Sequence, residues 1–142
     1  MQVIKGIDGT LEVNNSYSGS TICYTGYNKM DFSKTSFVRR ANELGTPDVI
    51  LVCGGTNDGW AKSPIGDYKY ANWTEEDRKS FRPACAKMFA TLKEKHPKAK
   101  IVFILNYDIP VARIPKSCEK QKAHPTVAGM KTIADAVLPL VK

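Results

Sequence analysis

The sequence lacks the features that mark membrane-spanning, secreted and zinc-binding proteins. No stretch of the 142 residues approaches the roughly 20 apolar residues that a membrane-spanning helix requires. Met1 is not followed by the long apolar run of a secretory signal, and the sequence assigns no cellular compartment. None of the four cysteines forms a Cys-x-x-Cys pair, which argues against zinc and thioredoxin-type sites. We therefore expect no membrane partner, no bound metal and no cofactor.

The charge is unbalanced toward lysine and arginine. The chain has 21 basic and 14 acidic residues, which give a formal net charge of +7. A basic patch for nucleic acid would explain this excess, but the lysines are scattered and no aromatic-rich binding motif accompanies them. We therefore interpret the charge as that of a solvated surface and expect no nucleic-acid partner.

The hydrophobic pattern indicates one α/β domain over residues 1–142. Unbroken apolar runs at residues 49–53 and 101–105 are typical of strands buried on both faces of a parallel sheet. A further short strand is expected at residues 11–14. Amphipathic spacing and helix-end signals predict helices at residues 36–44, 74–96 and 126–141. Because strands alternate with helices, we expect a parallel sheet.

Three polar segments occupy positions where such a fold carries chemistry. Residues 18–20 follow the first predicted strand, residues 54–58 follow the second, and His124-Pro125 precedes the last helix. Ligands of open α/β sheets bind beyond the carboxyl ends of the strands. Asn57 offers an amide N–H to a developing oxyanion, and a neutral imidazole at His124 suits a general base. Each segment alone would also fit an ordinary polar loop.

Together and in this order, the segments resemble blocks two, three and five of the SGNH (GDSL-type) ester hydrolases. The resemblance rests on Asn15-Ser16-Tyr17-Ser18-Gly19-Ser20, Gly55-Thr56-Asn57-Asp58 and His124-Pro125. It implies that Gly19 and Asn57 donate to an oxyanion hole and that His124 is the base. It also makes Ser18 a catalytic candidate, and Gly55, Asp58 and Trp60 candidates for substrate binding.

The resemblance implies a three-layer, flavodoxin-like parallel sheet with one block missing. Block one, the Gly-Asp-Ser turn that carries the nucleophile, does not occur in the 142 residues. Ten residues precede Leu11, whereas a strand–helix–strand unit takes about 30. We therefore expect a single truncated SGNH-like domain, incomplete at its N-terminus and without the first strand. Its unpaired strand edges would favour a homo-oligomer.

The acid and the nucleophile of the site also depart from the family pattern. Gln121 occupies the usual acid position, so Glu119 is the nearest substitute and Asp108 a more distant one. Replacing a triad acid by an amide costs about 10⁴-fold in the serine proteases. The possible substitutes for the missing serine are two hydroxyls and two thiols, at Ser18, Ser20, Cys23 and Cys53.

The resemblance implies a serine ester hydrolase of the esterase, lipase or carbohydrate deacetylase type, acting on a small ester or acylated carbohydrate. The main alternative is a catalytically inactive, hydrolase-like domain that binds a ligand. A nucleotide-binding flavodoxin-like protein is the third possibility, but it leaves Asn57 and His124 unexplained. Four aromatic residues either line the pocket or cover the edge of the core: Trp60, Tyr68, Tyr70 and Trp73.

Overall fold

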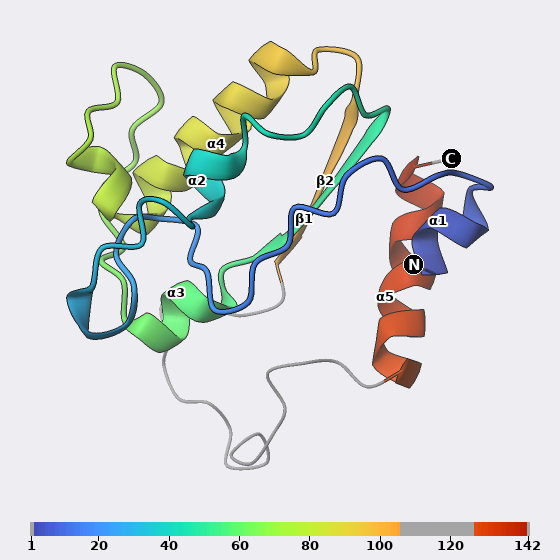
Figure 1. The fold of residues 1–142 in the computed structure, drawn as a ribbon, viewed down its shortest axis with the longest axis horizontal. Coiled ribbons are helices and arrows are strands. Elements are labelled where there is room, and N and C mark those ends of the chain that lie inside the picture. The colour runs from blue at the N-terminus through green and yellow to red at the C-terminus, as the bar shows by residue number, and fades with distance from the viewer. Residues whose placement is uncertain (1, 106–126, 142) are drawn as a thin grey trace. The chain divides into compact units, whose positions relative to one another are not determined.

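The computed structural model describes residues 2–105 and 127–141, which form helices and a small parallel sheet (Figure 1). The chain divides into two compact units, one formed by residues 15–112 and the other by residues 1–14 with residues 113–142. None of the described helices is long and apolar enough to cross a membrane.

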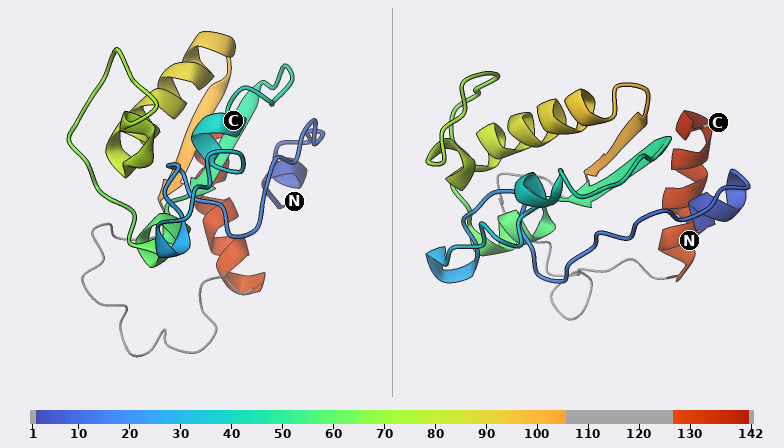
Figure 2. Two further views of the ribbon diagram at one scale, coloured as in Figure 1. Left: turned by 60° about the vertical axis from the view of Figure 1, so that its left-hand side comes forward. Right: turned by 45° about the horizontal axis from the view of Figure 1, so that its top comes forward.

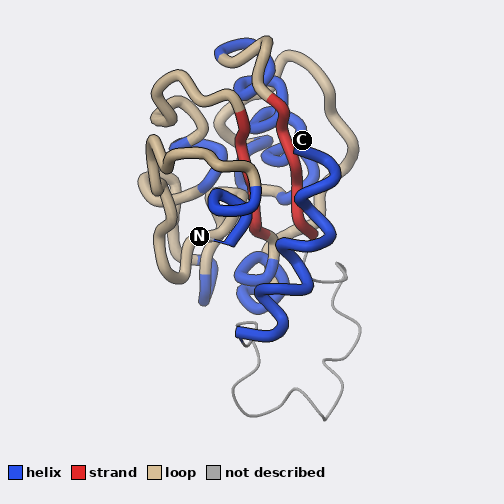
Figure 3. The backbone as a smooth tube through the Cα atoms, turned by 90° about the vertical axis from the view of Figure 1, so that its right-hand side faces the viewer, coloured by secondary structure: helices blue, strands red, loops and turns tan. Residues whose placement is uncertain are grey.

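The sheet of the larger unit consists of two parallel strands. β1 (Val49–Gly54) pairs with β2 (Lys100–Leu105) in a register that sets Val49 opposite Lys100 and Gly54 opposite Leu105 (Figure 3). Both predicted apolar runs are therefore strands, and their parallel pairing is confirmed.

Burial of β1 on both faces, which we predicted, is wrong. The strand alternates, with Ile50 and Val52 buried while Leu51 and Cys53 are exposed. The buried side chains join a core shared with helices α2 (Phe37–Arg40) and α4 (Phe81–Lys95). These helices therefore cover the face of the sheet that carries Ile50 and Val52, and this alternation is the period-two pattern of a half-buried strand.

The predicted strand at residues 11–14 is not formed. This segment is irregular, and Leu11 and Val13 are 48% and 42% exposed. Strand backbone needs a neighbour for its N–H and C=O groups. Among the described residues the sheet contains only β1 and β2, and residues 11–14 pair with neither strand.

Helix α4 lies alongside the strand pair and supplies much of the core (Figure 2). Ala84, Met88 and Leu92 are almost fully buried. The Phe89 ring meets the Phe103 ring of β2 edge-to-face, with 5.3 Å between the centroids. Such aromatic pairs contribute about 0.5–1.5 kcal/mol beyond their burial.

The start of α4 differs from the prediction. Thr74 and Asp77 do cap one another, since the Thr74 N–H donates to Asp77 Oδ2 at 2.6 Å. Their bonds close the turn that leads into the short 3-10 helix η2 (Asp77–Lys79), however, and α4 begins only at Phe81. Proline is tolerated only in the first turn of a helix. Pro83 therefore requires the helix to begin close before it.

The smaller unit pairs the two ends of the chain. Helix α1 (Gln2–Gly6) packs on α5 (Val127–Val141). A Cβ at Gly6 would overlap the Leu138 side chain, so glycine permits this close approach. The predicted C-terminal helix is confirmed, with Ala134 and Val137 buried.

Candidate active site

A glycine turn directly after β1 carries the first part of the site. Gly55 has a φ of 101°, a left-handed conformation that glycine adopts without strain. Helix α3 (Thr56–Ala61) begins at the next residue. The turn therefore places Asn57 and Asp58 in the first turn of α3, beyond the carboxyl end of the strand, where open sheets bind ligands.

The side chain of Asn57 joins the two sequence blocks of the predicted oxyanion hole. Its Nδ2 donates to the Ser20 carbonyl oxygen at 2.9 Å. Its Oδ1 accepts a hydrogen bond from the Tyr27 hydroxyl at 2.9 Å. Because an amide nitrogen carries two donors, the second N–H of Asn57 has no acceptor among the described residues. The Asn57 side chain therefore contacts the residue directly after Gly19 and keeps one N–H for a ligand.

Gly19 lies on the rim of a hollow of about 550 Å³. Its φ is +78°, and a Cβ built there would meet no other atom within 4 Å. The remaining lining consists of Tyr17, Ser18, Ser20, Tyr27 and residues 31–35. A volume of this size falls within the range of about 300–1,000 Å³ typical of small-molecule sites. The hollow is thus open beside Gly19 and contains two of the residues that Asn57 binds.

Asp58 lies inside the protein and is only 2% exposed. Its Oδ2 accepts the Ile22 N–H at 2.8 Å, and its Oδ1 accepts the Cys23 N–H at 3.1 Å. Burial raises the pKa of Asp58, while these backbone donors oppose the increase. Both oxygens are thus used to hold the segment after Gly19 against α3. The geometry favours this supporting role over the direct substrate contact that we predicted.

The substitute nucleophiles differ sharply in their surroundings. Cys23 is fully buried, and burial together with the charge of Asp58 raises the pKa of its thiol to about 12. Since the thiolate is the reactive form, Cys23 is a poor nucleophile, and burial also raises the pKa of Cys53. Ser20 is buried, and its Oγ accepts a hydrogen bond from Arg40 at 3.0 Å. Ser18 is exposed and is the one of the four that lines the hollow with its residue neither buried nor engaged by Arg40.

Arg40 is a part of the site that the sequence did not reveal. Its Nη1 donates to the carbonyl and side-chain oxygens of Asn15, and its Nη2 donates to Ser20. Its Nε donates to the Thr35 carbonyl oxygen at 2.9 Å. One guanidinium thus ties both ends of the segment that contains Gly19 to α2. No local motif links Asn15 to a residue 25 positions away, and Tyr27, the partner of Asn57, was missed for the same reason.

Other predicted site residues lie away from the hollow or outside the described residues. Trp60 is 47% exposed on α3, and none of the four aromatic residues that we considered as pocket walls belongs to the lining. His124 and Glu119 lie outside the described ranges, as do Gln121 and Asp108. Within the part of the chain that the structure describes, no group of three or more His, Cys, Asp or Glu side chains could hold a metal ion.

Comparison with known proteins identifies the family. A family model described as GDSL-like lipase/acylhydrolase matches residues 1–118. A crystal structure from Bacteroides uniformis, assigned as a GDSL-like lipase, is 42% identical and covers 97% of this chain and 72% of its own, with a TM-score of 0.85. A second, from Bacteroides ovatus with the same assignment, is 38% identical and covers 96% of this chain and 73% of its own, with a TM-score of 0.83. No curated protein matches.

These similarities confirm the predicted resemblance and the predicted α/β fold class with its parallel sheet. They extend over nearly all of the chain, and the matched residues 1–118 include Gly19 and Asn57. The chain belongs to the GDSL-like lipase/acylhydrolase family.

Proposed function

We propose that this chain is an ester-hydrolase domain in which Gly19 and Asn57 bind the carbonyl oxygen of a small ester or acylated carbohydrate. The observation that carries the proposal is the hydrogen bond from Asn57 Nδ2 to the Ser20 carbonyl. This bond holds the residue after Gly19 beside the first turn of α3. Donors fixed in this way stabilise the oxyanion of acyl transfer without reorganising during the reaction.

The base follows the family pattern, whereas the acid and the nucleophile are substitutes. His124 is the general base. Glu119 takes the role of the acid, because Gln121 occupies the usual acid position. Ser18 is the nucleophile available on the hollow, where attack on the ester carbonyl would form an acyl-enzyme and release the alcohol. Water would then hydrolyse the acyl-enzyme and regenerate the serine hydroxyl.

A second candidate function is binding of an acyl ligand without turnover. It is favoured by the environment of the substitute nucleophiles, since Ser20 is engaged by Arg40 and the Cys23 thiol stays protonated. Under this reading the hollow and its amide donors remain useful as a recognition site for an acetyl or acyl carbonyl.

Hydrolysis of p-nitrophenyl acetate by the full chain separates the two functions. We expect turnover above the buffer rate that is lost in His124→Ala and Ser18→Ala and kept in His96→Ala, the matched control at the only other histidine. Turnover that survives His124→Ala would contradict the proposed base. Absence of turnover in every protein, with saturable shifts of the Gly19 amide on adding N-acetylglucosamine, would support the binding function.

A further inference from the structure

A second hollow, of about 320 Å³, lies between α2 and α4 and shares no lining residue with the first. Arg39 lies on α2, with Asn42 just after it, Arg78 lies on η2, and Lys87 and Lys95 lie on α4. We call this hollow the α2–α4 basic pocket. Its volume is at the lower end of the range for small-ligand sites, about 300–1,000 Å³.

The lining of the α2–α4 basic pocket is strongly positive. Four basic side chains face one acidic residue, Glu94. Clefts lined by charges of one sign focus the electric field and concentrate ions of the opposite sign. The lysines and arginines of the chain are therefore not only a scattered surface charge, because four of them gather at one concave site.

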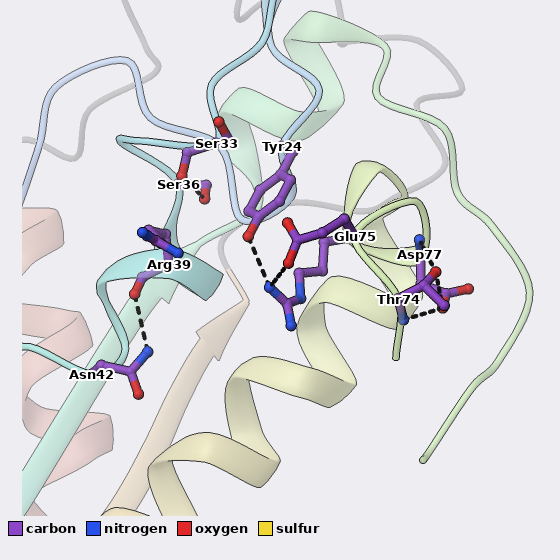
Figure 4. Close-up of polar contacts among 9 residues, drawn as sticks. Tyr24, Ser33, Ser36, Arg39, Asn42, Thr74, Glu75 and Asp77 are labelled. Atoms are coloured by element: carbon purple, nitrogen blue, oxygen red, sulfur yellow. Dashed lines mark hydrogen bonds and ion pairs between the residues drawn. The ribbon is translucent and has the colours of Figure 1, made fainter. Parts of the chain in front are cut away.

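Two of the cations are held in place by their neighbours. Arg78 Nη1 donates to the Tyr24 hydroxyl at 3.2 Å and pairs with the Glu75 carboxylate, and Figure 4 shows both groups converging on one guanidinium. Arg78 Nε is buried and has no hydrogen-bond partner among the described residues. The Lys87 ammonium lies 5.5 Å from the centre of the Trp73 ring. These contacts orient the two cations before any ligand arrives.

The other two cations, Arg39 and Lys95, are available to pair with a ligand. Arg39 and Lys95 form no ion pair with any residue that the structure describes. Asn42 Nδ2 donates to the Arg39 carbonyl at 3.3 Å, which holds this amide at the end of α2 (Figure 4). The pocket therefore combines oriented cations with free donors, a combination that suits an oxyanion of more than one charge.

We propose that the α2–α4 basic pocket binds a multiply charged oxyanion, a phosphate or sulfate group, either free or carried on a small molecule. The excess of positive charge requires more than a single negative charge to balance it. Tetrahedral oxyanions present several acceptor oxygens to the arginine and lysine donors that surround the hollow. This site is separate from the ester-binding hollow and does not depend on ester hydrolysis.

A ¹H–¹⁵N NMR titration of the whole chain with inorganic phosphate, at constant ionic strength set by sodium chloride, tests this proposal. We expect saturable shifts of the Asn42 side-chain amide and of the Arg39 and Arg78 Nε–H signals in the millimolar range. Sulfate should produce the same pattern. Glucose 6-phosphate should bind at least as well as free phosphate if the group is carried on a sugar, and more weakly if the pocket takes the free ion. Equal shifts with glucose would overturn the oxyanion assignment.

Charge-matched variants complete the test. Arg39→Gln and Lys87→Gln should each weaken phosphate binding by about 10- to 100-fold, the value of one hydrogen bond to a charged group. Lys93→Gln removes the same charge from an exposed position of α4 outside the pocket and should bind as the wild type does. Spectra that match outside the pocket establish that the variants are folded. Linear shifts spread over exposed lysines, or equal weakening by Lys93→Gln, would refute the site.

Discussion

Replacing Asp58 with asparagine measures how strongly the buried carboxylate holds the segment after Gly19. The carboxylate accepts two backbone N–H groups, from Ile22 at 2.8 Å and from Cys23 at 3.1 Å. Asparagine is nearly the same size but has only one acceptor oxygen. One of the two backbone donors would therefore face an amide NH₂ inside the protein.

The expected loss follows from this mismatch. A buried donor without a partner costs about 1–3 kcal/mol, and a hydrogen bond to a charged group contributes about 1.5–3 kcal/mol. The neutral amide avoids the desolvation that raises the pKa of Asp58, which offsets part of the loss. We therefore expect Asp58→Asn to lower the free energy of unfolding by about 1–3 kcal/mol at neutral pH.

Urea unfolding followed by circular dichroism measures this change, with Asp67→Asn as the control. Asp67 is exposed, so its variant removes the same charge without a buried partner and should unfold as the wild type does. The advantage of wild type over Asp58→Asn should be larger in acid. The pKa of Asp58 is raised in the folded state, so the folded state binds the proton more tightly than the unfolded state does. The contribution of Asp58 to stability therefore falls as pH rises from its unfolded pKa to its folded pKa. Equal or greater stability of Asp58→Asn at neutral pH would refute the reasoning.

The remaining predictions concern other contacts of the larger unit and the assembly of the chain. Arg40→Gln removes the donors to Asn15 and Ser20 and should speed hydrogen exchange of the Gly19 and Ser20 amides, whereas Arg39→Gln should not. Tyr27→Phe removes the bond to Asn57 and should cost about 0.5–1.5 kcal/mol in urea unfolding; an unchanged midpoint would contradict it. The Lys69 ammonium and the Thr74 donors lower the pKa of Asp77 from 3.8 to about 2. Asp77 therefore stabilises the fold above its unfolded pKa. In the wild type this contribution to the free energy of unfolding should disappear as pH falls toward 2. The Asp77→Asn variant should lack it at every pH. The homo-oligomer expected from the unpaired strand edges predicts a light-scattering mass above that of the 15.7 kDa chain, and a monomer mass would contradict it.

Local patterns were sufficient to predict the elements that form the sheet. The apolar runs at residues 49–53 and 101–105 correspond to β1 and β2 because runs rich in β-branched and other large apolar residues favour strands. The segment at residues 11–14 alternates apolar and polar residues but pairs with neither strand, and pairing is a property of the whole fold. The start of α4 depended on Pro83, which outweighed the capping pair at Thr74 and Asp77.

The candidate site also combines features that local sequence predicts with features that depend on the whole fold. The strand-end rule applies to Asn57, which follows β1, but not to Gly19, because the strand predicted before Gly19 is not formed. The bond from Asn57 to the Ser20 carbonyl nevertheless brings the two segments together. The burial of Asp58 and the contacts of Arg40 were not predictable, because both depend on backbone groups that come close only in the folded chain. A carboxylate next to a candidate oxyanion donor suggested substrate binding, whereas the fold uses it internally.

The most direct test of the proposed function compares ester turnover by the wild type and Asn57→Asp. Aspartate keeps an oxygen for the Tyr27 hydroxyl but loses the N–H donor and adds a negative charge beside the developing oxyanion. We expect wild-type turnover of p-nitrophenyl acetate to exceed the buffer rate and to fall by about 10²-fold or more in the variant, the usual effect of losing one oxyanion-hole donor. Equal turnover in the two folded proteins would contradict an oxyanion hole at Asn57.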